Sequence, residues 1–212
     1  MITRMTSIFV ALLSLTAAAV LLPQVRAENA NPDPLSENSI LHDRSVPALG
    51  NERGDITIVE YFDYQCPYCR KVDPELMKIV HDDGHIRLIF KDWPIFGGPS
   101  IYASRLALAA QYQNKFAEAH EALISLREKL SPERIESALA AAGVDLERAK
   151  GDLAASQSEI DTLLARNHAQ AVALGFQGTP AFIIGHFRVP GAPNAAAFKQ
   201  AIADARAAAH RK

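Results

Sequence analysis

The amino-acid sequence predicts an α/β fold in which an all-helical segment is inserted. Residues 56–62 and 85–90 are rich in β-branched, aromatic or alternating apolar residues, and a helical pattern separates them. A helical pattern of roughly 75 residues follows, which is too long for an ordinary loop. Two short strand patterns and a last helix, over residues 181–209, complete the order. This order is typical of a sheet covered by helices.

Residues 1–27 are predicted to be a signal peptide. Arg4 supplies a positive charge, residues 8–22 are almost entirely apolar, and Val25-Arg26-Ala27 fits a cleavage site. The apolar run has about 15 residues, whereas a helix that spans a bilayer needs about 20; an uncleaved membrane anchor is the alternative. Cleavage would leave 185 of the 212 residues and would change the formal net charge from −2 to −4. We therefore expect an exported protein, located in the periplasm.

The charged residues of the chain are mixed in sign and are not clustered. The 22 Lys and Arg residues form no stripe interleaved with aromatic residues, so the sequence predicts no nucleic-acid partner. A chain of this length suits one domain with a substantial core, or one domain with a large insertion.

The predicted elements begin after a segment rich in turn and coil formers. Residues 28–50 contain many Asn, Pro, Asp and Ser residues and are expected to form an N-terminal extension. Residues 51–98 form the first part of the α/β domain, with the two strands and a helix from residue 67 to 80. Pro67 suits the first helical turn, where its missing N–H would have no partner, whereas Pro74 should kink the helix.

The helical insertion is predicted over residues 99–175. Helices are expected over 101–127, from 132 to 143, near 146–150 and over 158–174. Residues 176–212 form the second part of the α/β domain, with strands over 181–184 and 187–189 and a helix over 195–209. Ser131, Asp145 and Asn194 are expected to cap three of these helices.

Cys66 and Cys69 are the two cysteines of the chain, and they lie at the junction of the first strand and its helix. A disulfide between them would close a very short loop, which removes little entropy from the unfolded chain and stabilises poorly. Exported proteins generally meet an oxidising environment. We therefore interpret the pair as a redox-active site.

Three stretches of the sequence resemble the DsbA-like thiol–disulfide oxidoreductases: Cys66-Pro67-Tyr68-Cys69, residues 59–64, and Gly178-Thr179-Pro180-Ala181-Phe182. The spacing, with Leu49-Gly50-Asn51 before the first strand, is similar to the ScsC-like branch. The resemblance implies a thioredoxin-like fold with an all-helical domain inserted, and it implies no cofactor and no metal. Some members of that branch trimerise through a long N-terminal stalk. Because residues 28–50 are short and rich in coil formers, we expect a monomer.

The two cysteines are assigned different roles. A thiolate attacks a disulfide, and the positive end of a helix favours an anion. Cys66, at the start of the predicted helix, is therefore assigned as the nucleophile and Cys69 as the buried resolving thiol. Pro67 and Tyr68 offer little positive charge, so we expect a less extreme oxidant than a protein with histidine beside its second cysteine.

Three further residues are assigned from the resemblance. Glu60 matches a buried acid near the second cysteine that transfers protons; an acid that faces solvent from a strand is the alternative. Pro180 matches a cis-proline that faces the cysteines and exposes backbone to a substrate peptide; a trans proline at a strand start is the alternative. Thr179 is expected to help set the reduction potential and substrate release.

Two groups of aromatic and histidine residues have less specific interpretations. Trp93, Ile95 and Phe96 line an apolar substrate groove, or they pack between the two subdomains. His120 is expected at the surface or at an interface.

The leading functional hypothesis is an exported DsbA-like oxidase that exchanges disulfides with exported proteins containing cysteines. A membrane partner must reset it, either a DsbB-like oxidase or a DsbD-like reductase. The alternatives are a reductase or isomerase of the same fold, and a non-catalytic exported protein that binds soft metals such as copper(I) or other proteins. The residues leave the direction of electron flow open.

Overall fold

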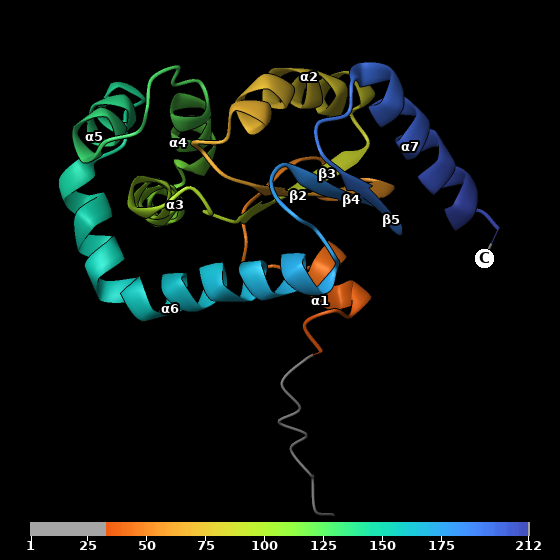
Figure 1. Ribbon diagram of the computed structural model, residues 1–212, viewed down its shortest axis with the longest axis horizontal. Helices are drawn as coiled ribbons and strands as arrows, with labels where there is room; N and C mark the ends of the chain where they lie inside the picture. The colour runs from red at the N-terminus through yellow and green to blue at the C-terminus, as the bar shows by residue number, and fades with distance from the viewer. Residues whose placement is uncertain (1–32, 212) are drawn as a thin grey trace, which may run out of the picture. The chain divides into compact units, whose positions relative to one another are not determined.

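The computed structural model describes residues 33–211 of the chain (Figure 1). The predicted signal peptide, residues 1–27, and the first residues of the predicted extension lie outside the described residues. Within the part that the structure describes, no helix combines the length and the apolar character needed to cross a membrane.

A five-stranded mixed sheet forms the centre of the fold, with the strand order β1-β3-β2-β4-β5. The strands are β1 (Ala48–Gly50), β2 (Ile56–Phe62), β3 (Ile86–Asp92), β4 (Ala181–Ile184) and β5 (Phe187–Pro190). Only the β2–β3 pair is parallel; the other pairs of this described sheet are antiparallel. Because Phe62 pairs with Asp92, the carboxyl ends of the two parallel strands meet at one edge.

Helices cover both faces of the sheet (Figure 1). Helices α2 (Pro67–Asp83) and α7 (Ala195–Ala209) pack on the face that carries Ile58 and Phe62. Helices α1 (Glu37–Leu41) and α6 (Leu146–Ala173) pack on the opposite face, which carries Val59 and Tyr61. The alternation along β2 follows from the period of two in a strand, and both faces are apolar because both are covered.

The helical segment between β3 and β4 contains α3 (Gly98–Ala110), a short 3-10 turn (Gln111–Gln113), α4 (Phe116–Ile124), α5 (Pro132–Ala141) and α6. The predicted caps Ser131, Asp145 and Asn194 are confirmed, since each side chain accepts a backbone N–H three residues later. The two helices expected over 146–174 form one run with a kink at Ser156. The sequence pattern there has no proline to separate them completely.

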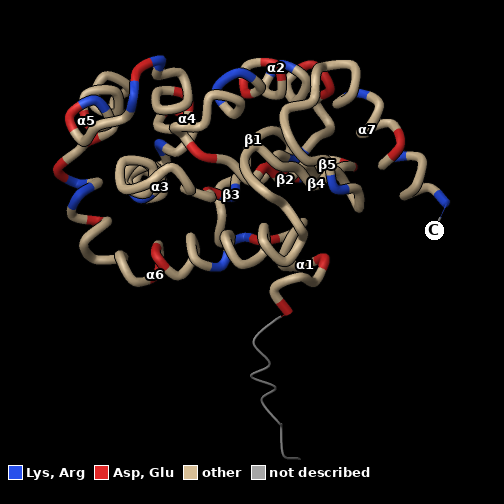
Figure 2. The backbone as a smooth tube through the Cα atoms, in the orientation of Figure 1, with Lys and Arg blue, Asp and Glu red and all other residues tan. Residues whose placement is uncertain are grey.

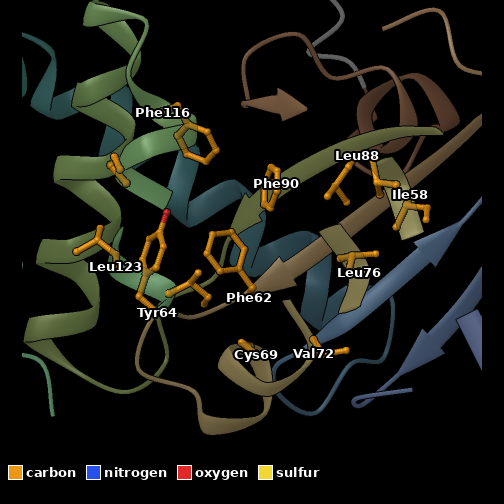
Figure 3. Packing of buried hydrophobic residues seen from close by; sticks show 14 of the residues in the cluster. Ile58, Phe62, Tyr64, Cys69, Val72, Leu76, Leu88, Phe90, Phe116 and Leu123 are labelled. Atoms are coloured by element: carbon orange, nitrogen blue, oxygen red, sulfur yellow. The ribbon is translucent and has the colours of Figure 1, made fainter. Parts of the chain in front are cut away.

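The aromatic core continues from the sheet into the helical segment (Figure 3). Phe62 contacts Tyr64 and Phe90 edge to face, with ring centroids 5.0 and 5.8 Å apart. Phe90 in turn packs on Phe116 of α4 at 5.6 Å. The end of β2, where the cysteines follow, is therefore packed directly against the helical insertion.

Residues 33–50 contain more regular structure than their composition predicts. They form α1 and the edge strand β1, and Ile40 and Leu41 are buried. Asp43 accepts a hydrogen bond from Lys91, whose side chain is fully buried, at 2.9 Å, and a second from Arg166 at 2.7 Å. These partners lie far along the chain, so local composition does not reveal them.

Charged residues are distributed over the described helices with both signs interspersed (Figure 2). The bidentate contacts of Arg206 in α7 with Asp55 and Asp83 are an example, with N–O distances of 2.7–2.9 Å. They join α7 to the start of β2 and the end of α2.

Candidate active site

Cys66 is the N-cap residue of α2, and its sulfur accepts the backbone N–H of Cys69 at 3.5 Å. The extended backbone of Cys66, with φ −69° and ψ 120°, and Pro67 in the first turn favour a helix that begins at this point. Both cysteines are free thiols. Cys66 is 1% exposed and Cys69 is fully buried, whereas Pro67 and Tyr68 between them are exposed.

The Thr179–Pro180 loop lies directly over the nucleophile candidate. In its thiol form, Cys66 Sγ donates to the carbonyl oxygen of Thr179 at 3.2 Å, across 113 positions of sequence. The pairing of Tyr61 with Ala181 brings the start of β4 to the end of β2 and explains this approach. The Thr179–Pro180 peptide bond is cis. The structure therefore brings together Cys66, Cys69, Thr179 and Pro180.

The two thiols have opposite pKa shifts. Hydrogen bonding with the Cys69 thiol lowers the pKa of Cys66 to about 6, and burial opposes the shift. Burial is the main cause that raises the pKa of Cys69 far above its ordinary value, and the nearby Glu60 adds to it. At neutral pH the pair therefore holds a thiolate on Cys66 and a proton on Cys69, which suits a nucleophile and a resolving thiol.

Glu60 is buried in the centre of β2, with 1% of its surface exposed. It shares the sheet face of Ile58 and Phe62, which α2 covers. Among the described residues, its Oε2 atom has no hydrogen-bond partner. Burial, followed by the charges of Asp73, Cys66 and Asp92, raises the pKa of Glu60 well above its ordinary value. Because its pKa is raised, the Glu60 carboxyl keeps its proton to a higher pH than an ordinary glutamate, and it can pass that proton to a thiolate at Cys69.

A buried polar cluster that the sequence analysis did not assign lies beside the cysteine helix. His120 of α4 is 2% exposed; its Nε2 atom lies 3.0 Å from Asp73 Oδ1 and its Nδ1 atom 3.3 Å from Tyr64 Oη. The three residues join α4, α2 and the active-site turn. His120 is thus an interface residue, one of the two placements expected. Tyr64 lies two residues before Cys66, and Asp73 lies four residues after Cys69. Their spacing in the sequence does not indicate that His120 is their partner.

Asp63 shapes the turn between β2 and α2. Its Oδ1 accepts the N–H of Gln65 at 2.7 Å, and its Oδ2 accepts the N–H groups of Ile95 and Phe96 at 2.7 and 3.0 Å. An Asp directly after a strand is a turn signal that the sequence analysis did not use.

Three apolar side chains near this turn are exposed: Tyr68 at 61%, Ile95 at 41% and Phe96 at 46%. Trp93, in contrast, is 4% exposed, and its Nε1 atom donates to His168 of α6 at 2.9 Å. Each of the two interpretations from the sequence therefore fits part of this group. Trp93 packs between structural elements, whereas Ile95 and Phe96 are exposed at the surface.

Within residues 33–211, no group of three or more His, Cys, Asp or Glu residues is placed to hold a metal ion.

A family model described as thioredoxin matches residues 43–204, which is most of the chain. The chain belongs to the thioredoxin family. The predicted thioredoxin-like fold with a helical insertion is confirmed by this match and by the solved structures that resemble the chain.

This thioredoxin-family chain is similar to solved structures over most of their length. A thioredoxin-like oxidoreductase from Silicibacter pomeroyi is 37% identical with a TM-score of 0.77, and the match covers 81% of this chain and 98% of that one. The catalytic domain of Proteus mirabilis ScsC is 26% identical with a TM-score of 0.73, with coverage of 80% and 94%. The predicted likeness to the ScsC-like branch is confirmed by this match.

Curated relatives are similar over only part of their length. A putative protein-disulfide oxidoreductase from Rickettsia felis is 27% identical over 168 residues, which is 74% of this chain and 59% of that protein. A Na(+)/H(+) antiporter NhaA 1 from Salinispora arenicola is 28% identical over 158 residues, or 74% of this chain. This thioredoxin-family chain spans about a quarter of that antiporter's length, at 24%.

Proposed function

We propose that this protein is a thiol–disulfide oxidoreductase that exchanges disulfides with protein substrates through Cys66 and Cys69. The observation that carries the proposal is the position of Cys66 Sγ. It caps α2, accepts the Cys69 N–H at 3.5 Å and lies 3.2 Å from the Thr179 carbonyl oxygen. A sulfur with a pKa of about 6, next to a buried protonated thiol, is arranged both to attack a disulfide and to leave from one.

In the oxidising direction, a substrate thiolate attacks Cys66 Sγ of the Cys66–Cys69 disulfide. The bond between the two sulfurs breaks, and the Cys69 sulfur leaves and takes a proton from Glu60. A second substrate thiolate then attacks the substrate sulfur of the mixed disulfide, and Cys66 leaves as a thiolate. The substrate loses two electrons and gains one disulfide, while the protein is left with the Cys66 thiolate and the Cys69 thiol. Glu60 takes a proton back from solvent before the next cycle. The reverse sequence reduces a substrate disulfide.

The pKa of Cys66 favours the oxidising direction. Whatever stabilises the thiolate of the reduced form makes the disulfide a stronger oxidant, and about 30 mV corresponds to about 1.4 kcal/mol. We therefore propose a DsbA-like oxidase. A reductase or isomerase of the same fold is the alternative function. No cation at Pro67 or Tyr68 adds to the effect, so the oxidant is expected to be moderate.

The remaining roles complete the proposal. Thr179 and Pro180 present backbone to an extended substrate segment, and Tyr68, Ile95 and Phe96 offer apolar surface beside it. The substrates are exported proteins with cysteines, met in the periplasm after removal of residues 1–27. A membrane protein of the DsbB type, or of the DsbD type for the reducing direction, resets the cysteines.

The test is disulfide exchange by the protein and by its Cys66→Ser and Cys69→Ser variants. Oxidation of a reduced unfolded protein and reduction of insulin are measured side by side. Both variants are expected to lose turnover, and full activity in Cys66→Ser would exclude the proposed function. The reduction potential of the pair decides the direction: a value near −120 mV favours oxidation and one near −270 mV favours reduction.

A further inference from the structure

The active-site turn, residues 63–66, is bonded by side chains to the connection between α4 and α5. We name that connection, residues 125–131, the rim loop. The Gln65 side chain, directly before the nucleophile candidate, accepts the N–H of Leu130 at 3.0 Å. Its Nε2 atom donates to the carbonyl oxygen of Phe96 at 3.3 Å. The Gln65 side chain thus joins the active-site turn both to the rim loop and to the segment between β3 and α3.

Arg70 makes a second connection from the other side of the cysteine pair. Its Nε atom donates to the Tyr64 carbonyl oxygen at 2.7 Å, and its Nη1 atom donates to the Glu128 carbonyl oxygen at 3.1 Å. Arg70 lies in the first turns of α2, next to Cys69, and α2 and α4 lie side by side (Figure 1). The rigid guanidinium fork therefore ties the turn before Cys66 to the rim loop.

Leu130 and Leu126 anchor the rim loop in the hydrophobic core, but few side-chain hydrogen bonds hold its exposed backbone. Leu130 is buried, whereas Ser125, Arg127, Glu128 and Lys129 are exposed. Arg134 of α5 donates to the Lys129 carbonyl oxygen at 2.9 Å. Among the described residues, the other side-chain hydrogen bonds to residues 125–130 come from Gln65 and Arg70. A connection of this kind opens easily when its bonds are removed, because loops with exposed backbone are the least stable parts of a fold.

We propose that Gln65 and Arg70 are positioning residues that keep the rim loop against the active-site turn, so that protein substrates meet a preformed edge beside Cys66. The inference rests on the proposed function and adds a substrate-contacting segment from the helical insertion to it. A small thiol reaches the Cys66 sulfur without touching this edge. A protein substrate covers the turn and the loop together, because Leu130 N lies within one side-chain length of the residue that precedes Cys66.

Arg70 also carries a charge, and the test must separate that charge from its hydrogen bonds. Arg70→Lys retains the cation but loses the planar fork that reaches two carbonyl oxygens at once. Arg70→Met loses both, and Gln65→Ala removes the Leu130 and Phe96 bonds without a change in charge. Lys71→Met is the matched control, since Lys71 is an exposed cation one residue further along α2.

Amide hydrogen exchange of residues 125–131 and disulfide exchange are measured on the full chain. In Gln65→Ala, Arg70→Met and Arg70→Lys we expect faster amide exchange in the rim loop, above all at Leu130. We also expect kcat/KM for a reduced unfolded protein to fall roughly tenfold, mainly through KM, as the loss of one charge-assisted hydrogen bond predicts. In Gln65→Ala and Arg70→Lys, the rate with dithiothreitol and the titration midpoint of Cys66 should stay close to wild type. In Arg70→Met the midpoint should rise, because a cation that interacts with the Cys66 thiolate is removed. Lys71→Met should change none of these quantities.

Three results would overturn the assignment. They are unchanged rim-loop exchange in Gln65→Ala, full recovery of protein turnover in Arg70→Lys, and an equal loss with dithiothreitol and with protein in Gln65→Ala. Either of the first two results would show that the Gln65 and Arg70 hydrogen bonds do not cause the loss of protein turnover. The third would show that the substitution acts on the reactivity of Cys66 itself. If the wild-type protein exchanged no disulfides at all, the proposed function would fail instead, and the two failures are therefore distinguishable.

Discussion

Cys66 Sγ lies 3.2 Å from the carbonyl oxygen of Thr179, although 113 positions of sequence separate the two residues. The same sulfur faces the N–H of Cys69 within its own helix. The sulfur is therefore contacted from two elements, and its ionisation is the most direct property to measure.

The reduced protein should show a thiolate absorbance at 240 nm that titrates with a midpoint of about 6. Because the hydrogen bond with the Cys69 thiol is the main cause of that low pKa, Cys69→Ala should move the midpoint upward, toward the ordinary value of a thiol. Alkylation of Cys66 at different pH values gives an independent measurement. An unchanged midpoint in Cys69→Ala would assign the shift to the helix N-terminus alone.

The lowered pKa of Cys66 also predicts how pH affects the stability of the reduced protein. Its pKa is about 6 in the folded state and about 9 in an unfolded chain, so the thiolate contribution is fully present above pH 9. It is lost as the pH falls toward 6. Urea unfolding of the reduced form, compared with the oxidised form at each pH, should show the reduced form gaining stability from pH 6 to 9. A Cys66→Ser variant should lack this gain.

Glu60→Gln should slow exchange and stabilise the fold. Loss of the proton donor to Cys69 is expected to lower the turnover rate by roughly 100-fold or more. The pKa of Glu60 is raised by burial, so its ionised form destabilises the folded state increasingly as pH rises above about 4.5. Gln carries no charge, and the variant should be more stable than wild type by about 1–3 kcal/mol at pH 8. Thermal unfolding at pH 4 should show a much smaller difference.

His120→Ala should destabilise the protein by about 3 kcal/mol, because it leaves a cavity among aromatic rings and removes the partner of Asp73 and Tyr64. Urea unfolding measures this loss. The control is His81→Ala, since the His81 side chain is 89% exposed and should change stability by less than about 0.5 kcal/mol. If His120→Ala and His81→Ala caused equally small losses of stability, the buried cluster of His120, Asp73 and Tyr64 would contribute little to the stability of the fold.

Lys91→Met should also destabilise, by about 3 kcal/mol, because it leaves Asp43 with Arg166 as its remaining cation. Lys78→Met is the exposed comparison: its i,i+4 pair with Asp82 is solvated, so its loss should change stability far less. If the two variants lost the same stability, the buried position of Lys91 would not matter.

The parts of the molecule that follow from local pattern were predictable. Strand β2, helix α2 and the position of Cys66 at their junction follow from β-branched residues, an apolar helical face and Pro67. The Ser131, Asp145 and Asn194 caps follow from the preference of these side chains for the first turn. The approach of Pro180 to Cys66 came from the family resemblance, since a Thr-Pro sequence alone does not indicate where it packs.

The remaining features depend on pairs that are distant in sequence. Lys91 and Asp43 are 48 positions apart, His120 and Asp73 are 47 apart, and Gln65 and Leu130 are 65 apart. Each side chain has an ordinary appearance in its own segment: a strand lysine, a helix histidine and a turn glutamine. Only the tertiary packing makes them partners, so neither their burial nor their hydrogen bonds can be inferred from spacing.

The contacts of the first described residues set a limit for shortened forms of the protein. Gln170 Nε2 donates to the Pro34 carbonyl oxygen at 2.7 Å, and Gln170 Oε1 accepts from the buried Lys91 ammonium at 2.9 Å. A form of the protein that started after Asp43 would leave that ammonium inside the protein without its carboxylate. It would also lack α1, which covers one face of the sheet together with α6. The shortest form suitable for expression and crystallisation therefore begins no later than Pro34. This start lies well before Glu60, the first residue assigned to the redox chemistry.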